Sequence, residues 1–378
     1  MSGYTANSAG AGAAYFRLDR DGASWNLVDP HGDPFFTVGL NHVDETNLKY
    51  PHNYEVWKQK YGSRRSWITD GVVADLGDWG FNTLGWTQEY VSGDLSAELD
   101  WFGDPIDLGF SLPWSAADLQ ASGMPYVVQI RVSEIEDWNG HPWFPDVYSD
   151  EFDAYCEYLA RSICVDHVGS TNLLGYFLVD IPAWLPHPSG ADFVLLQGLD
   201  ERSRNIKLYD VAYRYYETIT RHIRAVDPNH LILGDRYNGN NGIPKAVLTA
   251  MKHFVDVLSV QYLPDPTPEG RDRMVRDLRA WHAYTDKPVI LADICNWTPT
   301  ELNPARTSLL ASQAERGADY VDSLEPLLQE PWFLGWHWCG YVENTARGWG
   351  LKDPWDEPYE DLVSPVRELN TRATSCRA

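Results

Sequence analysis

The chain has 378 residues, of which 44% are hydrophobic, and it carries a formal net charge of −24 at pH 7. This length and apolar content suit one large core, and a single barrel with long loops fits them better than two average domains. The negative charge repels phosphate backbones and anionic lipid surfaces, so it argues against nucleic-acid and membrane partners and disfavours strongly acidic polymers. A small, neutral substrate is therefore expected.

The first 34 residues predict an N-terminal segment whose hairpin, residues 15–34, closes the bottom of a barrel formed by residues 35–378. From residue 35 on, short apolar runs alternate with helix-compatible segments, which is typical of repeated β-α units and a parallel sheet. There are eight runs: Phe35–Asn41, Phe81–Trp86, Tyr126–Arg131, Leu173–Asp180, His230–Arg236, Val255–Tyr262, Pro288–Asp293 and Trp332–Trp338. The clearest helical stretches are Ser149–Val165, Lys207–Val226, Pro244–His253, Gly270–Tyr284 and Leu309–Leu328.

Eight such units predict an α/β fold of the (β/α)₈ TIM-barrel type, in which the active site lies on the loops that follow the strands. Long segments do follow the predicted strands, at residues 93–123, 133–150, 185–205, 295–308 and 339–358. The chain also contains 17 Trp and 21 Tyr. Aromatic planes stack on the apolar faces of sugar rings, so this composition suits a saccharide, although most such residues in a protein serve packing.

Two aspartates are the candidate catalytic residues: Asp180 ends the fourth predicted strand and Asp293 the seventh, so they face each other across the barrel mouth. Cleavage of a glycosidic bond needs one carboxylic acid to protonate the leaving oxygen and a second carboxylate as nucleophile or base. The alternative is that either aspartate caps a helix or pairs with Arg236.

Further side chains at strand ends and in the long loops are expected to bind the substrate. Asp235 and Arg236 either orient a carboxylate and bind a hydroxyl or form an internal ion pair. Tyr262 either donates a hydrogen bond to Asp293 or is a rim aromatic. The full set of expected substrate-binding residues is Asn41, His42, Trp86, Glu89, Trp184, Asp235, Arg236, Tyr262, Trp297, Trp338 and Glu343.

The five cysteines are odd in number and show no CxxC or Cys/His ligand spacing, so neither a disulfide framework nor a metal site is indicated. No GxxxxGK[ST] loop or GxSxG elbow is present, and no cofactor is expected. The N-terminus lacks the basic and apolar parts of a signal peptide, so the expected location is the cytoplasm. The oligomeric state is left open.

Several stretches, in this order, resemble the barrel glycoside hydrolases of clan A, and more narrowly their β-agarase-like branch, over roughly Phe35 to Leu369. They are FFTVGLN (35–41), WGFNTLG (79–85), FPDV (144–147), LGYFL (174–178), KPVI (287–290), GWHW (335–338), GLKD (350–353) and DEPY (356–359). The resemblance implies the barrel fold, glycosidase chemistry and an aromatic platform at Trp338 under the bound sugar.

The catalytic positions depart from that resemblance. Such enzymes carry an Asn-Glu pair at the end of strand four and a Glu at the end of strand seven, where this chain has Asp180-Ile181 and Asp293. In a first interpretation Asp180 is the acid and Asp293 its partner; the shorter side chains widen the gap by about 1 to 2 Å, which favours inversion. In a second, Asp293 is the nucleophile and a loop carboxylate supplies the acid: Glu89, Glu134, Asp137 or Glu343.

In a third interpretation the barrel binds sugar without cleaving it, or is a non-hydrolytic lyase or isomerase. The first is preferred, so the expected function is hydrolysis of a glycosidic bond in a neutral oligosaccharide or glycoside by an exo-acting enzyme. The sugar, the linkage and the anomer are not indicated by the sequence.

Overall fold

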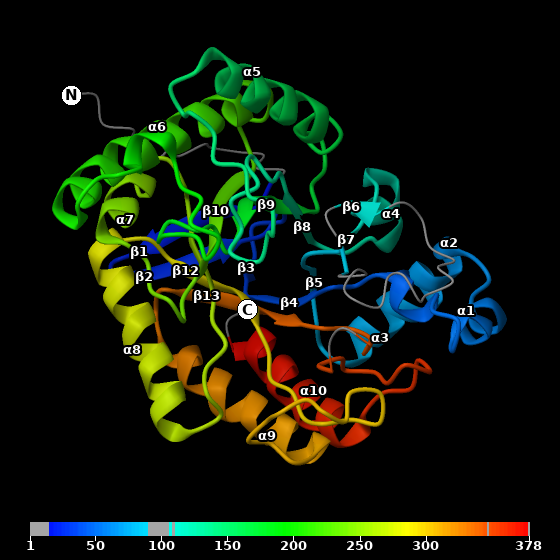
Figure 1. Cartoon of the computed structure of the whole chain (residues 1–378). Helices are drawn as coiled ribbons and strands as arrows, with labels where there is room; N and C mark the ends of the chain where they lie inside the picture. Colours follow the sequence, from blue (N-terminus) through cyan, green and yellow to red (C-terminus); the bar gives the residue numbers. More distant parts are fainter. Residues whose placement is uncertain (1–14, 90–105, 108–109, 346–347, 377–378) are drawn as a thin grey trace.

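Eight parallel strands close into a barrel in the computed structural model, which describes residues 15–89, 106–107, 110–345 and 348–376 (Figure 1). Around the barrel the order is β10-β11-β12-β13-β4-β5-β8-β9. The strands are β4 (Thr37–Asn41), β5 (Thr83–Leu84), β8 (Tyr126–Gln129), β9 (Leu173–Asp180), β10 (Leu231–Asn238), β11 (Leu258–Gln261), β12 (Val289–Ile294) and β13 (Phe333–Cys339). Each lies within or overlaps one of the eight predicted runs, which confirms the α/β class and is consistent with a TIM barrel.

Helices surround the barrel, and their ends follow from local sequence (Figure 1). The side chain of Asp200 caps the long helix α6, and α8 begins at Pro268 after the capping Thr267. The α-helices are α1 (Tyr54–Lys60), α2 (Arg64–Ser66), α3 (Val73–Asp78), α4 (Ala116–Ser122), α5 (Asp150–Leu159), α6 (Glu201–Val226), α7 (Lys245–Met251), α8 (Pro268–Thr285), α9 (Gln313–Leu324) and α10 (Glu360–Cys376). Shorter 3₁₀ or π segments are η1 (Glu45–Leu48), η2 (Trp67–Val72), η3 (Ala160–Cys164), η4 (Val194–Leu196) and η5 (Glu325–Gln329).

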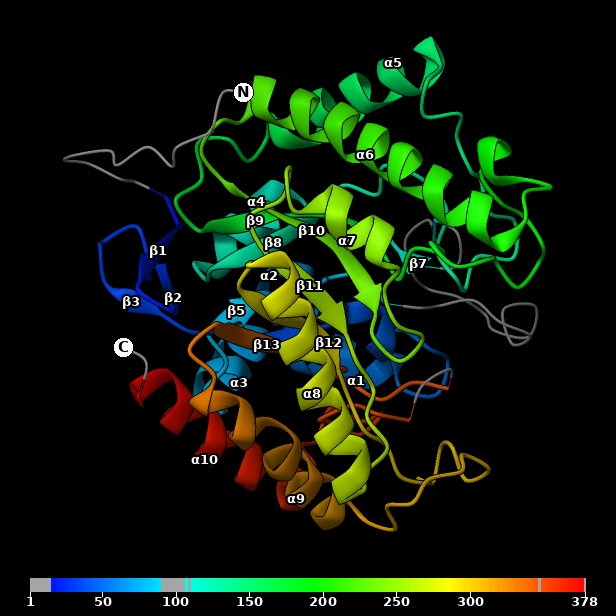
Figure 2. The ribbon, with the colours of Figure 1, turned by 90° about the vertical axis from the view of Figure 1, so that its left-hand side faces the viewer.

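The predicted N-terminal hairpin is present: β1 (Arg17–Asp21) pairs antiparallel with β2 (Ser24–Val28), which pairs with β3 (Pro34–Phe35). Phe16 and Leu27 pack in one cluster with inward-facing residues of the barrel strands, among them Leu174, Leu233 and Ile290. Figure 2 shows this hairpin, in blue, at one end of the barrel and the long loop after β12 at the other. The hairpin therefore covers the end of the barrel opposite the candidate site; the domain division at residue 34 stays a prediction.

A buried aspartate that accepts two side-chain hydrogen bonds holds the turn between α6 and β10. Asp227 accepts hydrogen bonds from His230 Nδ1 at 2.6 Å and Tyr176 Oη at 2.7 Å. Burial alone would raise the pKa of Asp227, but these hydrogen bonds outweigh it and lower the pKa from 3.8 to about 2. These two hydrogen bonds thus stabilise the ionised form of this carboxylate in the folded state.

No described helix combines the length and the apolar character that a bilayer crossing requires. The two strands β6 (Ile106–Asp107) and β7 (Phe110–Ser111) form a short antiparallel ribbon in the loop after β5. Of the expected loop at 93–123, residues 93–105 and 108–109 lie outside the described residues.

Candidate active site

One arginine joins the two candidate catalytic aspartates at the mouth of the barrel. Arg236 Nη1 lies 3.1 Å from Asp180 Oδ1, and Arg236 Nη2 lies 2.7 Å from Asp293 Oδ2. Because both contacts are made to one planar guanidinium, the two carboxylates lie within about 8 Å of each other, below the upper limit of about 9.5 Å for the paired carboxylates of glycosidases. Only 1% of the Arg236 surface is exposed, so water screens this triad little.

The strand that carries Arg236 contains a β-bulge that sets which side chains face the mouth. Leu231 and Leu233 point into the barrel, the register then shifts at Gly234, and Arg236 pairs with Asp180. Gly234 has φ +77°, a left-handed conformation that favours glycine. Arg236 therefore faces inward, whereas its neighbour Asp235 faces outward.

Both aspartates line a cavity of about 310 Å³, and four of its twelve lining residues are Trp or Phe. Trp138 Nε1 donates a hydrogen bond to Asp180 Oδ2 at 3.1 Å. The ring of Trp86 stacks on that of Phe110 with centroids 4.9 Å apart, and the guanidinium of Arg236 lies 5.1 Å from the Trp86 ring. The full lining is His42, Trp86, Phe110, Trp138, Asp180, Ile181, Gln261, Leu263, Asp293, Cys295, Cys339 and Trp349. Such a chamber, with apolar planes and a few convergent charges, suits a sugar ring.

Backbone strain is concentrated at this mouth. Of the five non-glycine residues with positive φ among the described residues, three directly or nearly follow a barrel strand: His42 (φ 55°), Arg131 (φ 56°) and Ile181 (φ 29°). A β-branched residue in this conformation costs on the order of 1 to 3 kcal/mol and persists only where its surroundings impose it. Ile181 is held by its N–H bond to the Arg236 carbonyl at 2.8 Å.

Two expected site residues at the outer face of β10 form a separate cluster with α6. Asp235 accepts hydrogen bonds from Tyr216 Oη at 2.5 Å and Trp184 Nε1 at 3.1 Å. Burial raises the pKa of Asp235 to about 7 despite these bonds. Asp235 is fully buried and does not line the cavity, and Trp184 borders a separate small cleft with Asp137. Neither side chain reaches the mouth in this structure.

Tyr262 and Trp338 are likewise placed away from the cavity. The hydroxyl of Tyr262 donates to Asp277 of α8 at 2.8 Å and not to the Asp293 carboxylate, whereas the Tyr262 backbone N–H donates to the Asp293 carbonyl oxygen at 2.9 Å. Along β13, Trp336 and Trp338 face outward to Tyr320 of α9, with the Trp338 and Tyr320 rings 4.6 Å apart. Side chains alternate along a strand, so the residue at the cavity is Cys339 and not the tryptophan expected as a sugar platform.

Three expected polar residues are engaged by the protein itself. Asn41 donates to the Ala292 carbonyl at 2.9 Å and accepts from the Trp86 N–H at 2.8 Å, which ties β4 to its neighbours at the mouth. Glu89 accepts from Asn47 Nδ2 at 2.9 Å. Glu343 accepts from Thr300, Asn303 and Tyr359 and so fastens the loops after β12 and β13. Their expected substrate contacts stay predictions.

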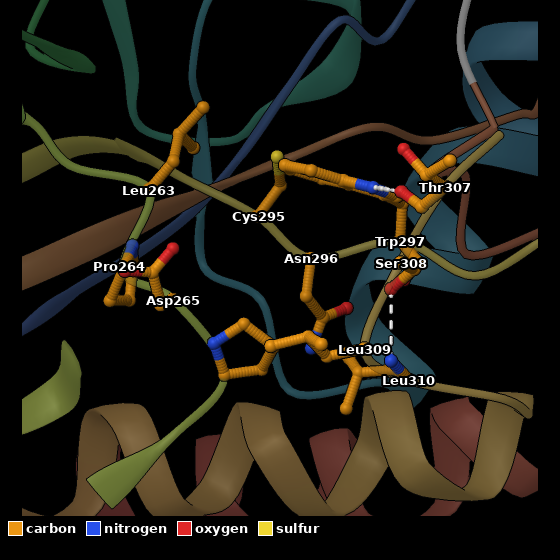
Figure 3. Close-up of a pocket in the computed structure, with 11 residues that line it drawn as sticks. Leu263, Pro264, Asp265, Cys295, Asn296, Trp297, Thr307, Ser308, Leu309 and Leu310 are labelled. Carbon is orange, nitrogen blue, oxygen red and sulfur yellow. Dashed lines mark hydrogen bonds between the residues drawn. The ribbon is translucent and has the colours of Figure 1, made fainter. Parts of the chain in front are cut away.

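A second pocket of about 320 Å³ adjoins the first, since Leu263 and Cys295 line both. Figure 3 shows Leu263 and Cys295 at one end of it and Leu309 and Leu310 at the other. Trp297, expected from the sequence to contact substrate, lines this pocket, and its Nε1 donates to the Thr307 carbonyl at 2.8 Å. The two pockets therefore share part of their walls.

Two carboxylates of the loop after β8 lie close to Asp180. Burial raises the pKa of Glu136 to about 7 even though Arg131 pairs with it at 2.6 Å. Burial also raises the pKa of Asp137, against a hydrogen bond from Asn238. Of the expected loop acids, Asp137 is thus one whose protonated form is favoured by burial.

Sequence reasoning did not single out several residues that line the cavity. Phe110, Trp138 and Trp349 come from long loops, where no strand periodicity indicates the direction of a side chain. Gln261 and Cys339 are the last residues of β11 and β13, so their strand-end positions were a usable signal. Cys295 follows β12 directly.

Comparison with known proteins supports the fold and the stated resemblance. No family model matches the chain. β-Agarase B of Vibrio sp. (strain JT0107) is 22% identical, over 95% of this chain and 48% of that protein. The solved structures of the agarase AgWH50C and of an exo-β-agarase both superpose with a TM-score of 0.73 at 18% identity, over 97% of this chain and 64% and 66% of theirs. The chain has the fold of these agarases. It spans about half the length of the curated relatives it matches.

Proposed function

We propose that the chain is a glycoside hydrolase that cleaves a neutral oligosaccharide in the mouth cavity. The observation that carries this proposal is the pair of aspartates, Asp180 and Asp293, which enter one aromatic-walled cavity from strands of a closed barrel. The similarity to proteins named as β-agarases supports the reaction class and makes neutral agarose-derived oligosaccharides the first substrates to test.

In the proposed reaction, protonated Asp180 donates its proton to the leaving glycosidic oxygen, and Asp293 takes a proton from the attacking water. Arg236 then stabilises the carboxylate that Asp180 becomes, at the moment when negative charge develops there. Aspartates in place of glutamates leave room for that water, so we propose inversion at the anomeric carbon. The product anomer, followed by proton NMR, tests this step directly.

We also propose exo action and a cytoplasmic location. The two adjoining pockets give one sugar chain a defined path, and one structure with the same fold is described as an exo-β-agarase. Long polymers do not enter cells, so a cytoplasmic enzyme receives short saccharides. Random internal cleavage of a polymer by the purified protein contradicts exo action, and cell fractionation tests the location.

A second candidate function is sugar binding without cleavage. Two observations favour it: Ile181 lines the cavity at the position where the resembled enzymes carry their acid, and the guanidinium of Arg236 pairs with both aspartates. An aliphatic side chain cannot transfer a proton, so the acid has to come from Asp180 or from the loop.

The decisive experiment measures turnover of a panel of neutral aryl glycosides and agarose-derived oligosaccharides. We expect Asp293→Asn and Asp180→Asn each to lower kcat by about a hundredfold or more. The matched control is Asp235→Asn, since this residue is adjacent to Arg236 but faces α6, and we expect its kcat to stay within about threefold of wild type. Wild-type protein that binds the oligosaccharides without turnover would establish the second candidate.

One more variant separates the two sources of the proton. If Asp180 is the acid, Asp137→Asn keeps its activity within about threefold, because the Asp137 side chain contacts Asn238 outside the cavity lining. If Asp137 of the loop after β8 is the acid, Asp137→Asn loses most of its activity on substrates with poor leaving groups, and Asp180→Asn loses less activity.

A further inference from the structure

Three side chains of different chemistry meet in the mouth cavity: an imidazole, a carboxylate and a thiol. Ligand atoms of His42, Asp293 and Cys339 all lie within 4.8 Å of one another, and all three residues are buried. His42 directly follows β4, Asp293 lies in β12 and Cys339 ends β13, and these three strands are consecutive in the barrel. We propose that they form a binding site for a thiophilic divalent cation, Zn²⁺ being the best match, and that the bound ion excludes the sugar from the cavity.

The first ligand is held in the tautomer that metal binding requires. His42 Nδ1 lies 2.7 Å from the Gln88 carbonyl oxygen, which can only accept a hydrogen bond. Nδ1 therefore carries the proton, and the lone pair is on Nε2. A backbone carbonyl behind the imidazole is the usual arrangement behind a metal-bound histidine. The His42 N–H also bonds to the Trp86 carbonyl, so the strained backbone is fixed.

The second and third ligands complete a set typical of zinc. Cys339 ends β13 on its inward side, is not in a disulfide, and lines the cavity. On binding, its S–H proton passes to solvent and the sulfur bonds to the ion; no electron is transferred. Asp293 keeps its Arg236 contact through Oδ2 and ligates through Oδ1. Nitrogen, oxygen and sulfur ligands together select Zn²⁺ over Mg²⁺ or Ca²⁺.

The geometry needs only small movements. Ligand atoms around tetrahedral zinc are about 3.5 Å apart, so the three side chains have to close by about 1 Å, which rotamer adjustment provides. The fourth position then opens into the 310 Å³ cavity. Two aspartates and one arginine leave the mouth with net negative charge, which attracts a cation.

The consequence for activity rests on the proposed function. An ion at Asp293 occupies the reacting carboxylate and the space of the sugar, so Zn²⁺ inhibits hydrolysis competitively. The binding itself requires no turnover. Absence of Zn²⁺ binding therefore does not refute the hydrolase activity, and absence of turnover does not refute the metal site.

The binding test uses the purified full chain with Zn²⁺ in isothermal titration calorimetry and Co²⁺ as a spectroscopic substitute. We expect one ion per chain and a thiolate-to-cobalt charge-transfer band. Cys339→Ser should abolish the band and weaken Zn²⁺ binding at least tenfold, and His42→Gln should weaken it similarly. Cys295→Ser is the matched control, because this thiol lines the same cavity but lies outside the three-residue group, and it should keep the band.

A thermal melt of each variant confirms that it is folded before titration. The proposal is overturned by a band that survives in Cys339→Ser, by a band lost equally in Cys295→Ser, or by no stoichiometric binding to the wild-type chain. In the active enzyme, Zn²⁺ should raise KM and leave kcat unchanged, with full recovery on addition of EDTA. Inhibition of equal strength in Cys339→Ser shows that the ion acts elsewhere and also overturns the proposal.

Discussion

Arg236 is the residue whose removal we expect to be most costly, because two buried carboxylates depend on it. It contacts Asp180 at 3.1 Å and Asp293 at 2.7 Å, and all three side chains are at most 7% exposed. Removing one partner of a buried ion pair typically costs about 3 to 5 kcal/mol, since the remaining charge is neither solvated nor paired. We therefore expect Arg236→Met to lower the free energy of unfolding by about 3 to 5 kcal/mol at pH 7.

The sign of the pH dependence follows from proton binding. In Arg236→Met the folded chain binds protons at the two orphaned aspartates more readily than the unfolded chain does, so its deficit relative to wild type shrinks as the pH falls toward 4. Urea unfolding followed by tryptophan fluorescence at pH 7 and pH 4 measures both values. Adding Asp180→Asn and Asp293→Asn to Arg236→Met should restore most of the loss.

Arg372 supplies the control, since it pairs with Glu325 at 2.7 Å on the surface. The two side chains are 46% and 49% exposed, so water solvates Glu325 once the arginine is gone. We expect Arg372→Met to cost no more than about 1 kcal/mol. The reasoning is refuted if Arg236→Met costs as little as Arg372→Met, or if its deficit is the same at both pH values.

Three further outcomes follow from the structure. Trp86→Ala should raise KM for oligosaccharides about tenfold in steady-state assays. Trp338→Ala should leave KM unchanged and lower the free energy of unfolding by about 3 to 5 kcal/mol. The reverse pattern contradicts the placement of these two rings. Asp227→Asn should lower the free energy of unfolding in urea by about 2 kcal/mol at pH 7, because the pKa of Asp227 in the folded state is lowered to about 2. The stability difference from wild type should disappear as the pH falls from 3.8 through 2. A difference that stays constant over this range refutes the prediction. Gly335→Ala should abolish or severely weaken folding in thermal melts, because its Cβ would lie 1.8 Å from the Thr37 carbonyl oxygen of β4, while Gly140→Ala, with open space around it, should melt like wild type.

The barrel was predictable because its strands are buried on both faces. Runs such as Leu173–Asp180 and Val289–Ile294 are apolar at nearly every position, and this continuous pattern is distinct from the amphipathic helices between them. The same feature explains why β5 (Thr83–Leu84) was predicted too long: apolar burial continues past the point where ladder hydrogen bonds end.

The direction of individual side chains at the strand ends was not predictable in the same way. The register shifts on either side of Gly234 decide that Arg236 faces the mouth and Asp235 does not. Strict alternation turns Trp338 out and Cys339 in, and no local pattern indicates which of two adjacent residues faces inward in a strand that is apolar throughout. His42 lies more than two hundred residues before Asp293 and Cys339, and those two are in different β-α units, so no short ligand spacing exists to detect.

The central claim is that a sugar is cleaved between Asp180 and Asp293 at the barrel mouth. A crystal structure of Asp293→Asn soaked with a neutral oligosaccharide tests it most directly, because the slowed variant retains the bond. The account predicts a glycosidic oxygen within hydrogen-bond distance of the Asp180 carboxyl and a sugar ring against Trp86. A saccharide bound solely beside Trp297, or one whose linkage lies out of reach of Asp180, would contradict it.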